Sequence, residues 1–229
     1  MQNKDLKNKE NGKTSIIIGA GSSLSTYSGK VSRLLFNHNT FSIGINNIIH
    51  TVIPDYHLWT NKKRLSQFGD NISESSCLVI GSGIPEKLIQ SKINRDYCRL
   101  QLIDQRNEPL HVSDDEIRGS FRTAGCVGIV LAHFMGASNI YVAGMDGYTL
   151  YNKKSLDKKK ANHHCYGSGY TDDAEWEDCL EKDRLVSQNL RNIYEYGIDF
   201  KIVTPTKFSK FHDSTILDGV MHEHTGYNI

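Results

Sequence analysis

The sequence predicts an α/β fold of the Rossmann-like type, in which helices cover both faces of a mainly parallel sheet. Three observations support this prediction. Short β-rich runs recur along the chain, helical stretches lie between several of them, and the first run ends in a glycine turn. Strands that alternate with helices favour parallel pairing, because each helical crossover returns the chain to the same edge of the sheet.

Seven runs rich in Ile, Val, Tyr and other β-forming residues are the expected strands. In chain order they are residues 15–19, 40–45, 56–60, 77–81, 98–103, 139–143 and 200–203. Two helices stand out between them. Residues 123–135 are small and apolar, which is typical of a buried helix, and residues 174–196 repeat apolar positions at helical spacing.

The first residues and the overall composition indicate the domain organisation and the classes of partner to expect. Residues 1–13 are rich in Lys, Asn and Glu, so we expect a disordered tail there and a single domain over residues 14–229. With 27 basic and 26 acidic residues, the net charge of +1 does not indicate nucleic-acid binding. We expect no transmembrane segment and a cytoplasmic location, either free or peripheral at the inner face of the membrane. Five widely spaced cysteines without a Cys-x-x-Cys pair predict reduced thiols.

Polar residues follow several predicted strands, at the edge of a parallel sheet where ligands bind. The turn after the first strand has two glycines and two hydroxyls before a helix, which suits a phosphate because backbone N–H groups can approach it closely. The turn lacks the third glycine of the dinucleotide fingerprint and the lysine of a Walker loop. The candidate binding residues at this edge are Gly19, Ala20, Gly21, Ser22, Ser23, Asn46, Asn47, Asn61 and Asp146.

The longest segment without strand character runs from residue 149 to residue 173, and we expect it to be a lid loop. It contains His163, His164, Tyr166 and Tyr170. A histidine here could act as a general acid or base, because its pKa lies near neutrality. Zinc binding by the two histidines and Cys165 is disfavoured, because adjacent side chains seldom point at one metal.

These motifs resemble those of the bacterial CMP-sialic acid-dependent sialyltransferases with a single Rossmann-like domain. The family's Gly-Asn-Gly-Pro-Ser-Leu turn is similar to residues 19–24, and its two nucleotide-contacting asparagines resemble Asn46 (or Asn47) and Asn61. Its Thr-Ser-Gly helix start is similar to Thr123, Ala124 and Gly125. Its Ser-Gly-Ile-Asp-Phe-Tyr run is similar to the stretch that ends at Tyr148.

The resemblance implies transfer of a sialic or another nonulosonic acid from a CMP-activated donor to a surface glycan or glycolipid. It implies a nucleotide held by the glycine turn and by Thr123, Ala124 and Gly125, with no metal or other cofactor. Tyr148, with Tyr166 or Tyr170, would donate to the departing phosphate. His164 or His163 would be the base.

Two departures from the family pattern keep alternatives open. The position of the family's catalytic histidine is occupied by Ser168, while the earlier histidine of that run is retained as His164, and the family's arginine is displaced to Arg122. The wider superfamily includes motility accessory factors and 6-hydroxymethylpterin diphosphokinases that use ATP. A diphosphokinase would need magnesium, on Asp146 with Asp55 or Asp172. A non-catalytic nucleotide-binding partner domain and a homo-oligomer are further possibilities.

Overall fold

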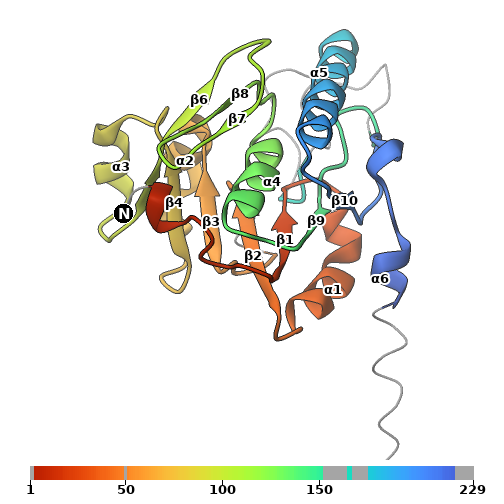
Figure 1. The fold of residues 1–229 in the computed structure, drawn as a ribbon, viewed down its shortest axis with the longest axis horizontal. Coiled ribbons are helices and arrows are strands. Elements are labelled where there is room, and N and C mark those ends of the chain that lie inside the picture. Colours follow the sequence, from red (N-terminus) through yellow and green to blue (C-terminus); the bar gives the residue numbers. More distant parts are fainter. Residues whose placement is uncertain (1–2, 49–50, 152–163, 167–174, 220–229) are drawn as a thin grey trace, which may run out of the picture.

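The computed structural model describes residues 3–48, 51–151, 164–166 and 175–219, and its centre is a seven-stranded sheet (Figure 1). The strand order is β10-β9-β1-β2-β3-β4-β5, and every neighbouring pair is parallel. The strands are β1 Thr14–Ile18, β2 Thr40–Ile45, β3 Tyr56–Trp59, β4 Cys77–Gly81, β5 Cys98–Leu100, β9 Asn139–Ala143 and β10 Lys201–Ile202. The predicted fold class is therefore confirmed.

Helices cover both faces of this sheet. They are α1 Leu24–Leu35, α2 Lys62–Phe68, α3 Glu86–Lys92, α4 Ala124–Phe134, α5 Trp176–Glu195 and α6 Thr215–Gly219, with short 3-10 turns at Asn3–Asp5, Gly69–Asn71 and Ser209–Phe211. Alternation along β1 shows the two faces, because Ile17 packs into the core beneath α4 and α5 while Ile16 and Ile18 pack beneath α1 and α6. None of the helices in the described ranges is both long and apolar enough to cross a bilayer.

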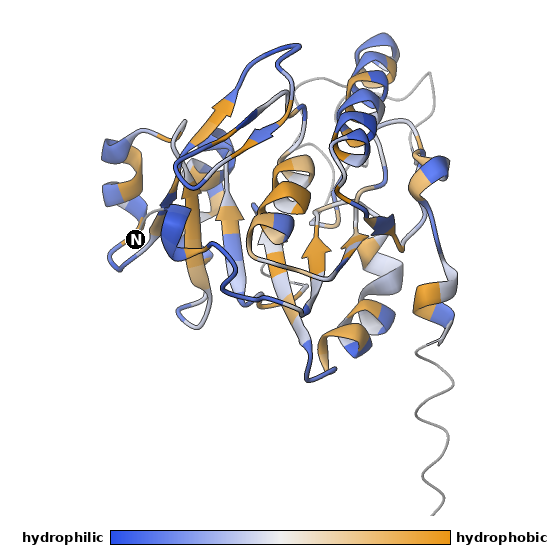
Figure 2. Ribbon diagram, in the orientation of Figure 1, coloured by the Kyte–Doolittle hydropathy of each residue, from blue (hydrophilic) through white to orange (hydrophobic). Residues whose placement is uncertain are grey.

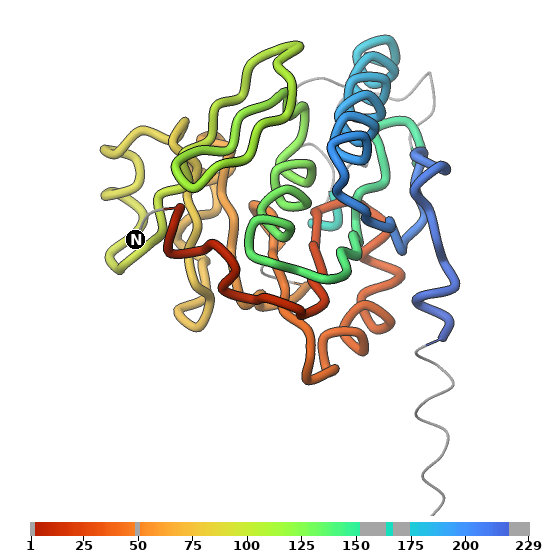
Figure 3. The backbone as a smooth tube through the Cα atoms, in the orientation of Figure 1, coloured from red at the N-terminus to blue at the C-terminus, as the bar shows by residue number. Residues whose placement is uncertain are grey.

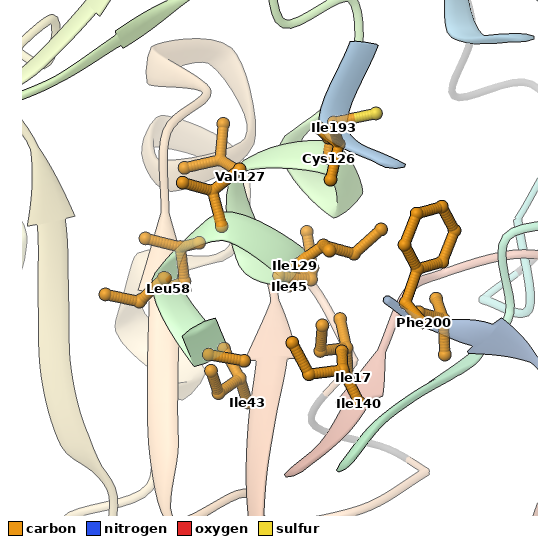
Figure 4. Close-up of a cluster of buried hydrophobic side chains, with 14 of the residues drawn as sticks. Ile17, Ile43, Ile45, Leu58, Cys126, Val127, Ile129, Ile140, Ile193 and Phe200 are labelled. Atoms are coloured by element: carbon orange, nitrogen blue, oxygen red, sulfur yellow. The ribbon is translucent and has the colours of Figure 1, made fainter. Parts of the chain in front are cut away.

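Helix α4 is the most deeply buried of the covering helices, as its small apolar composition predicts. Figure 2 shows it as predominantly hydrophobic, whereas α5 alternates hydrophilic and hydrophobic residues. A Cβ atom at Gly128 would lie 2.9 Å from Ile45 and 3.1 Å from Ile17, so the missing side chain lets α4 lie close to β1 and β2. The resulting cluster, with Val127 and Ile129 of α4 above the strands, is shown in Figure 4.

A second, three-stranded sheet was not predicted. The run expected as one strand over residues 98–103 is split, because β5 ends at Leu100 and β6 (Leu102–Asp104) pairs with β8 (Ile117–Gly119) and, through it, with β7 (His111–Val112). Gln101 lies between β5 and β6, and its backbone N–H donates a hydrogen bond to the side chain of Asn3. No glycine or proline marks this point, so the local sequence carries no signal for the split.

The prediction of a disordered tail is wrong for residues 3–13. Leu6 is completely buried in the main core. The backbone N–H groups of Asn8, Glu10 and Gly12 donate to carbonyl oxygens of residues 134–136, at the end of α4 and just beyond it. In Figure 3 this segment, in red, runs past the end of α4 before it enters β1. The polar side chains of this segment mostly face solvent. The burial of Leu6 and the backbone hydrogen bonds are enough to order it despite its polar composition.

We predict that Leu6→Ala lowers the free energy of unfolding by about 2–5 kcal/mol, because it leaves a cavity in the main core. The exposed neighbour Lys4 is the matched control, and Lys4→Ala should change stability by less than about 0.5 kcal/mol. Urea unfolding followed by circular dichroism measures both. Equal midpoints for the two variants would show that the first residues are not part of the cooperative fold.

Candidate functional site

A cavity of about 700 Å³ opens at the carboxyl edge of the large sheet. Loops that follow β1, β2, β3 and β9 line it, together with the start of α4, part of α2 and α5, and the residues His164 and Tyr166. Twelve predicted site residues lie in its wall: Gly19, Ala20, Gly21, Asn46, Asn61, Thr123, Ala124, Gly125, Asp146, Tyr148, His164 and Tyr166. Residues far apart in the sequence are therefore brought together, as strand-end reasoning predicts.

The remaining predicted residues fall into two groups. Ser22, Ser23 and Asn47 do not line the cavity, and the last two are buried. His163 and Tyr170 lie outside the described residues, as does most of the expected lid loop, so their roles stay predictions.

The glycine turn after β1 uses its hydrogen-bonding groups within the protein. The N–H of Gly19 donates to the carbonyl of Ala143 (2.8 Å), and the N–H of Gly21 donates to that of Gly144 (2.9 Å). Ser23 donates to the carboxylate of Asp146 through both its N–H (2.7 Å) and its hydroxyl. These bonds occupy the N–H groups of Gly19, Gly21 and Ser23, and phosphate binding by the rest of the turn stays a prediction. The turn contributes the shape of the cavity floor.

Asp146 therefore occupies the positive end of α1, where an external anion was expected. Its carboxylate is buried, which raises its pKa, while the two bonds from Ser23 act in the opposite direction. Gly21 is required for this approach, because a Cβ atom there would lie 2.6 Å from both the Asp146 carboxylate and the Gly144 carbonyl.

The loop that carries Tyr148 is held by α5. The carboxylate of Asp183 accepts hydrogen bonds from the N–H of Tyr148 (2.6 Å) and from the N–H and hydroxyl of Thr149. The ammonium group of Lys182, in the same helix, lies 5.2 Å from the centre of the Tyr148 ring. Burial raises the pKa of Tyr148, so its phenol stays protonated and can donate a hydrogen bond to an anion.

The N-terminus of α4 forms the adjacent wall. Thr123 caps this helix, its hydroxyl accepting from the N–H of Gly125 (3.4 Å). Arg122 precedes the cap, and its own N–H donates to the side chain of Asn189 in α5. Among the described residues, no carboxylate accepts from the first turn of α4, whereas Asp146 accepts from Ser23 at the start of α1. The positive end of α4, Arg122 and Lys182 together favour an anion at this wall.

Asn46 and Asn61 stand on the opposite wall, and both side-chain oxygens are engaged. That of Asn61 caps α2 by accepting from the N–H of Arg64 (3.1 Å), and that of Asn46 accepts from the N–H of Thr60 (3.4 Å). Their amide NH2 groups are what these side chains can offer a ligand. Both asparagines therefore suit a hydrogen-bond acceptor.

Residues 164–166 cross the same wall and connect α2 to the glycine turn. The N–H of Cys165 donates to the carbonyl of Ala20 (2.9 Å), and the ring of Tyr166 lies 5.4 Å from that of Phe68 in α2. The imidazole of His164 stacks on Tyr166 at 4.7 Å, with Arg64 Nη2 3.5 Å from its Nε2.

Several residues of the cavity wall escaped the sequence analysis. Lys63 and Arg64 of α2 and Lys182 of α5 add positive charge, and Asp104 of β6, which accepts from the N–H of Phe121 (2.9 Å), adds a carboxylate from the small sheet. Lys63 and Arg64 lie two and three residues after Asn61, so the strand-end rule could have found them. Lys182 lies in the middle of a long helix, with no local signal.

The placement of Asp55 corrects one magnesium hypothesis. Its carboxylate accepts from the N–H and hydroxyl of Ser42 at the amino end of β3, so it lies at the opposite edge of the sheet from Asp146. Asp172 lies outside the described residues. Within the described part of the chain, no group of three or more His, Cys, Asp or Glu side chains is arranged to hold a metal ion.

We predict that Gly21→Val destabilises the protein by more than about 2 kcal/mol, because the new side chain overlaps the Asp146 carboxylate and the Gly144 carbonyl. Gly83→Ala is the matched control, since Gly83 also lines the cavity but has no atom within 4 Å of an added Cβ. Thermal unfolding should separate the two variants. Equal stability would contradict the tight packing of the turn against the β9 loop.

No family profile and no curated protein sequence matches the chain. Among solved structures, it is similar to the MAf glycosyltransferase from Magnetospirillum magneticum AMB-1, with a TM-score of 0.54, 11% sequence identity, and coverage of 89% of this chain and 36% of that one. A mammalian sialyltransferase in complex with Gal-beta-1-3GalNAc-ortho-nitrophenol overlaps more loosely, with a TM-score of 0.44, 9% identity, and coverage of 85% of this chain and 70% of that one. The MAf likeness shows a glycosyltransferase-like α/β fold.

Proposed function

We propose that this chain is a glycosyltransferase that transfers a sialic or another nonulosonic acid from a CMP-activated donor to a glycan or glycolipid acceptor. The observation that carries the proposal is the composition of one cavity. The open N-terminus of α4, basic side chains, two asparagine amides, a tyrosine and a histidine all line it. The fold shared with the MAf glycosyltransferase supports the reaction class, and the motif resemblance supports the cytidine donor.

The charges of the cavity suit such a donor. A CMP-linked nonulosonic acid carries one negative charge on its phosphodiester and one on the carboxylate of the sugar. Arg122, Lys182 and the start of α4 offer one anionic subsite, and Lys63 and Arg64 contribute positive charge to the opposite wall. Of the two carboxylates in the described wall, that of Asp146 accepts from Ser23 and that of Asp104 accepts from Phe121.

The proposed reaction is an inverting displacement. The acceptor hydroxyl attacks the anomeric carbon, and the bond from that carbon to the phosphate oxygen breaks. CMP then leaves with the bonding electron pair. Tyr148 donates a hydrogen bond to the departing phosphate, with Tyr166 or Tyr170 as the second donor, and His164 or His163 takes the acceptor proton.

A binding panel tests the donor class. CMP, CDP and ATP are added with and without magnesium, and binding is followed by thermal unfolding and calorimetry. We expect CMP and CDP to bind without metal and, at about a hundred times Kd, to stabilise the fold by about 2.7 kcal/mol. Binding of ATP with magnesium, and no response to CMP or CDP, would favour the diphosphokinase instead. Binding without transfer would favour a partner domain.

We predict that Asn61→Asp weakens CMP binding at least tenfold while leaving stability unchanged. Aspartate caps a helix as well as asparagine does, but it replaces the amide donor with negative charge. Asn37→Asp makes the same chemical change at an exposed asparagine whose oxygen accepts from the N–H of Asn39, away from the cavity. Calorimetry measures both, and undiminished CMP affinity in Asn61→Asp would remove this residue from the site.

We also predict that His164→Ala lowers kcat at least a hundredfold, the loss typical for a missing general base, with little change in CMP affinity. CMP release from CMP-N-acetylneuraminate in the presence of an acceptor measures turnover. His111→Ala, at an exposed position of the small sheet, is the control. Near-normal turnover would assign the proton to another group, and loss of CMP binding would make His164 a binding residue.

A further inference from the structure

One completely buried histidine has no place in the site as described so far. His57 lies in β3, paired in register with Gly44 of β2, and has no exposed surface. It is not among the residues described in the cavity wall. Its imidazole lies 4.9 Å from the ring of Trp59, two residues along the same strand. Burying a polar ring in a central strand costs free energy unless its nitrogen atoms form hydrogen bonds.

The hydrogen bond of His57 goes to a residue of the cavity wall. Its Nε2 contacts the carbonyl oxygen of Asn46, and because a carbonyl only accepts, the proton must lie on Nε2. The other ring nitrogen, Nδ1, has no partner among the residues described. Burial lowers the pKa of His57 to about 4, so the ring is neutral near pH 7 and this tautomer persists.

Asn46 has a φ of 51°, in the left-handed region, which asparagine enters more readily than most other residues that carry a side chain. Three contacts with β3 and the residue after it hold this conformation: its N–H donates to Leu58 (2.9 Å), its side chain accepts from Thr60, and its carbonyl accepts from His57. The first two bonds hold the backbone N–H and the side-chain oxygen of Asn46, and the imidazole holds its carbonyl.

We propose that His57 is a positioning residue that acts through Asn46 to hold the amide of that residue in the cavity. The inference rests on the proposed function in one respect only, namely that the cavity binds a nucleotide. An apolar residue could fill the same place in β3 without burying an unpartnered nitrogen. Within the described part of the chain, the hydrogen bond of the imidazole connects it to a residue of the cavity wall.

A matched pair of variants tests this role. Glutamine and methionine have similar length, but only the glutamine amide can donate to the Asn46 carbonyl. We expect His57→Met to weaken CMP binding at least tenfold and to shift the side-chain amide signals of Asn46 in a ¹⁵N NMR spectrum. His57→Gln should restore both to within about threefold in affinity and near the wild-type shifts. The Asn46 signals are assigned by their loss in Asn46→Asp.

Trp59→Phe is the control, because it alters the adjacent buried ring without removing a bond to Asn46. Equal CMP affinity and unchanged Asn46 signals in His57→Met and His57→Gln would overturn the proposal, as would an equal effect of Trp59→Phe. If the wild-type protein does not bind CMP, the proposed function fails, while the Asn46 signals still decide the positioning role. Imidazole ¹⁵N shifts of the wild-type protein need no variant, and a proton on Nδ1 would also overturn it.

Discussion

The contact between Asp146 and the start of α1 is the interaction on which the cavity depends. It joins the loop after β9 to the turn after β1, two neighbouring strands at the centre of the sheet. Gly21 permits the approach, and Gly144, at a φ of 71°, turns the second loop toward the first. These bonds hold the two loops against each other at the floor of the cavity.

This contact also makes the N-termini of α1 and α4 differ in their surroundings. Both α1 and α4 begin at the carboxyl edge of the sheet, and each could attract an anion with its first turn. The chain's own carboxylate occupies α1, whereas the start of α4 lies in the cavity wall beside Arg122. The α4 side of the cavity therefore favours an anion, whereas the Asp146 carboxylate beside the turn after β1 disfavours one.

The order of strands and helices follows from hydrophobic patterning, and that patterning located the site edge as well. Asn46, Asn61, Asp146 and Tyr148 were found because each lies shortly beyond a predicted strand. Local patterning cannot show which distant residue a polar group hydrogen-bonds to. Ser23 was read as a ligand group because its bond to Asp146 spans 123 positions in the chain. Buried Leu6 escaped notice for the same reason, since its neighbours in sequence are polar and its partners are distant.

The early segment that contains Asn3 and Leu6 has a consequence for the order of events during synthesis. Asn3 is bonded to Gln101 and Asp115, and Asn8 to Phe134. These first residues leave the ribosome about a hundred residues before their partners exist, and contacts of such long sequence separation form slowly. We therefore expect residues 3–8 to dock only after residues 101–134 have been synthesised, so that the small sheet that bears Asp104 gains its contact with Asn3 late in folding.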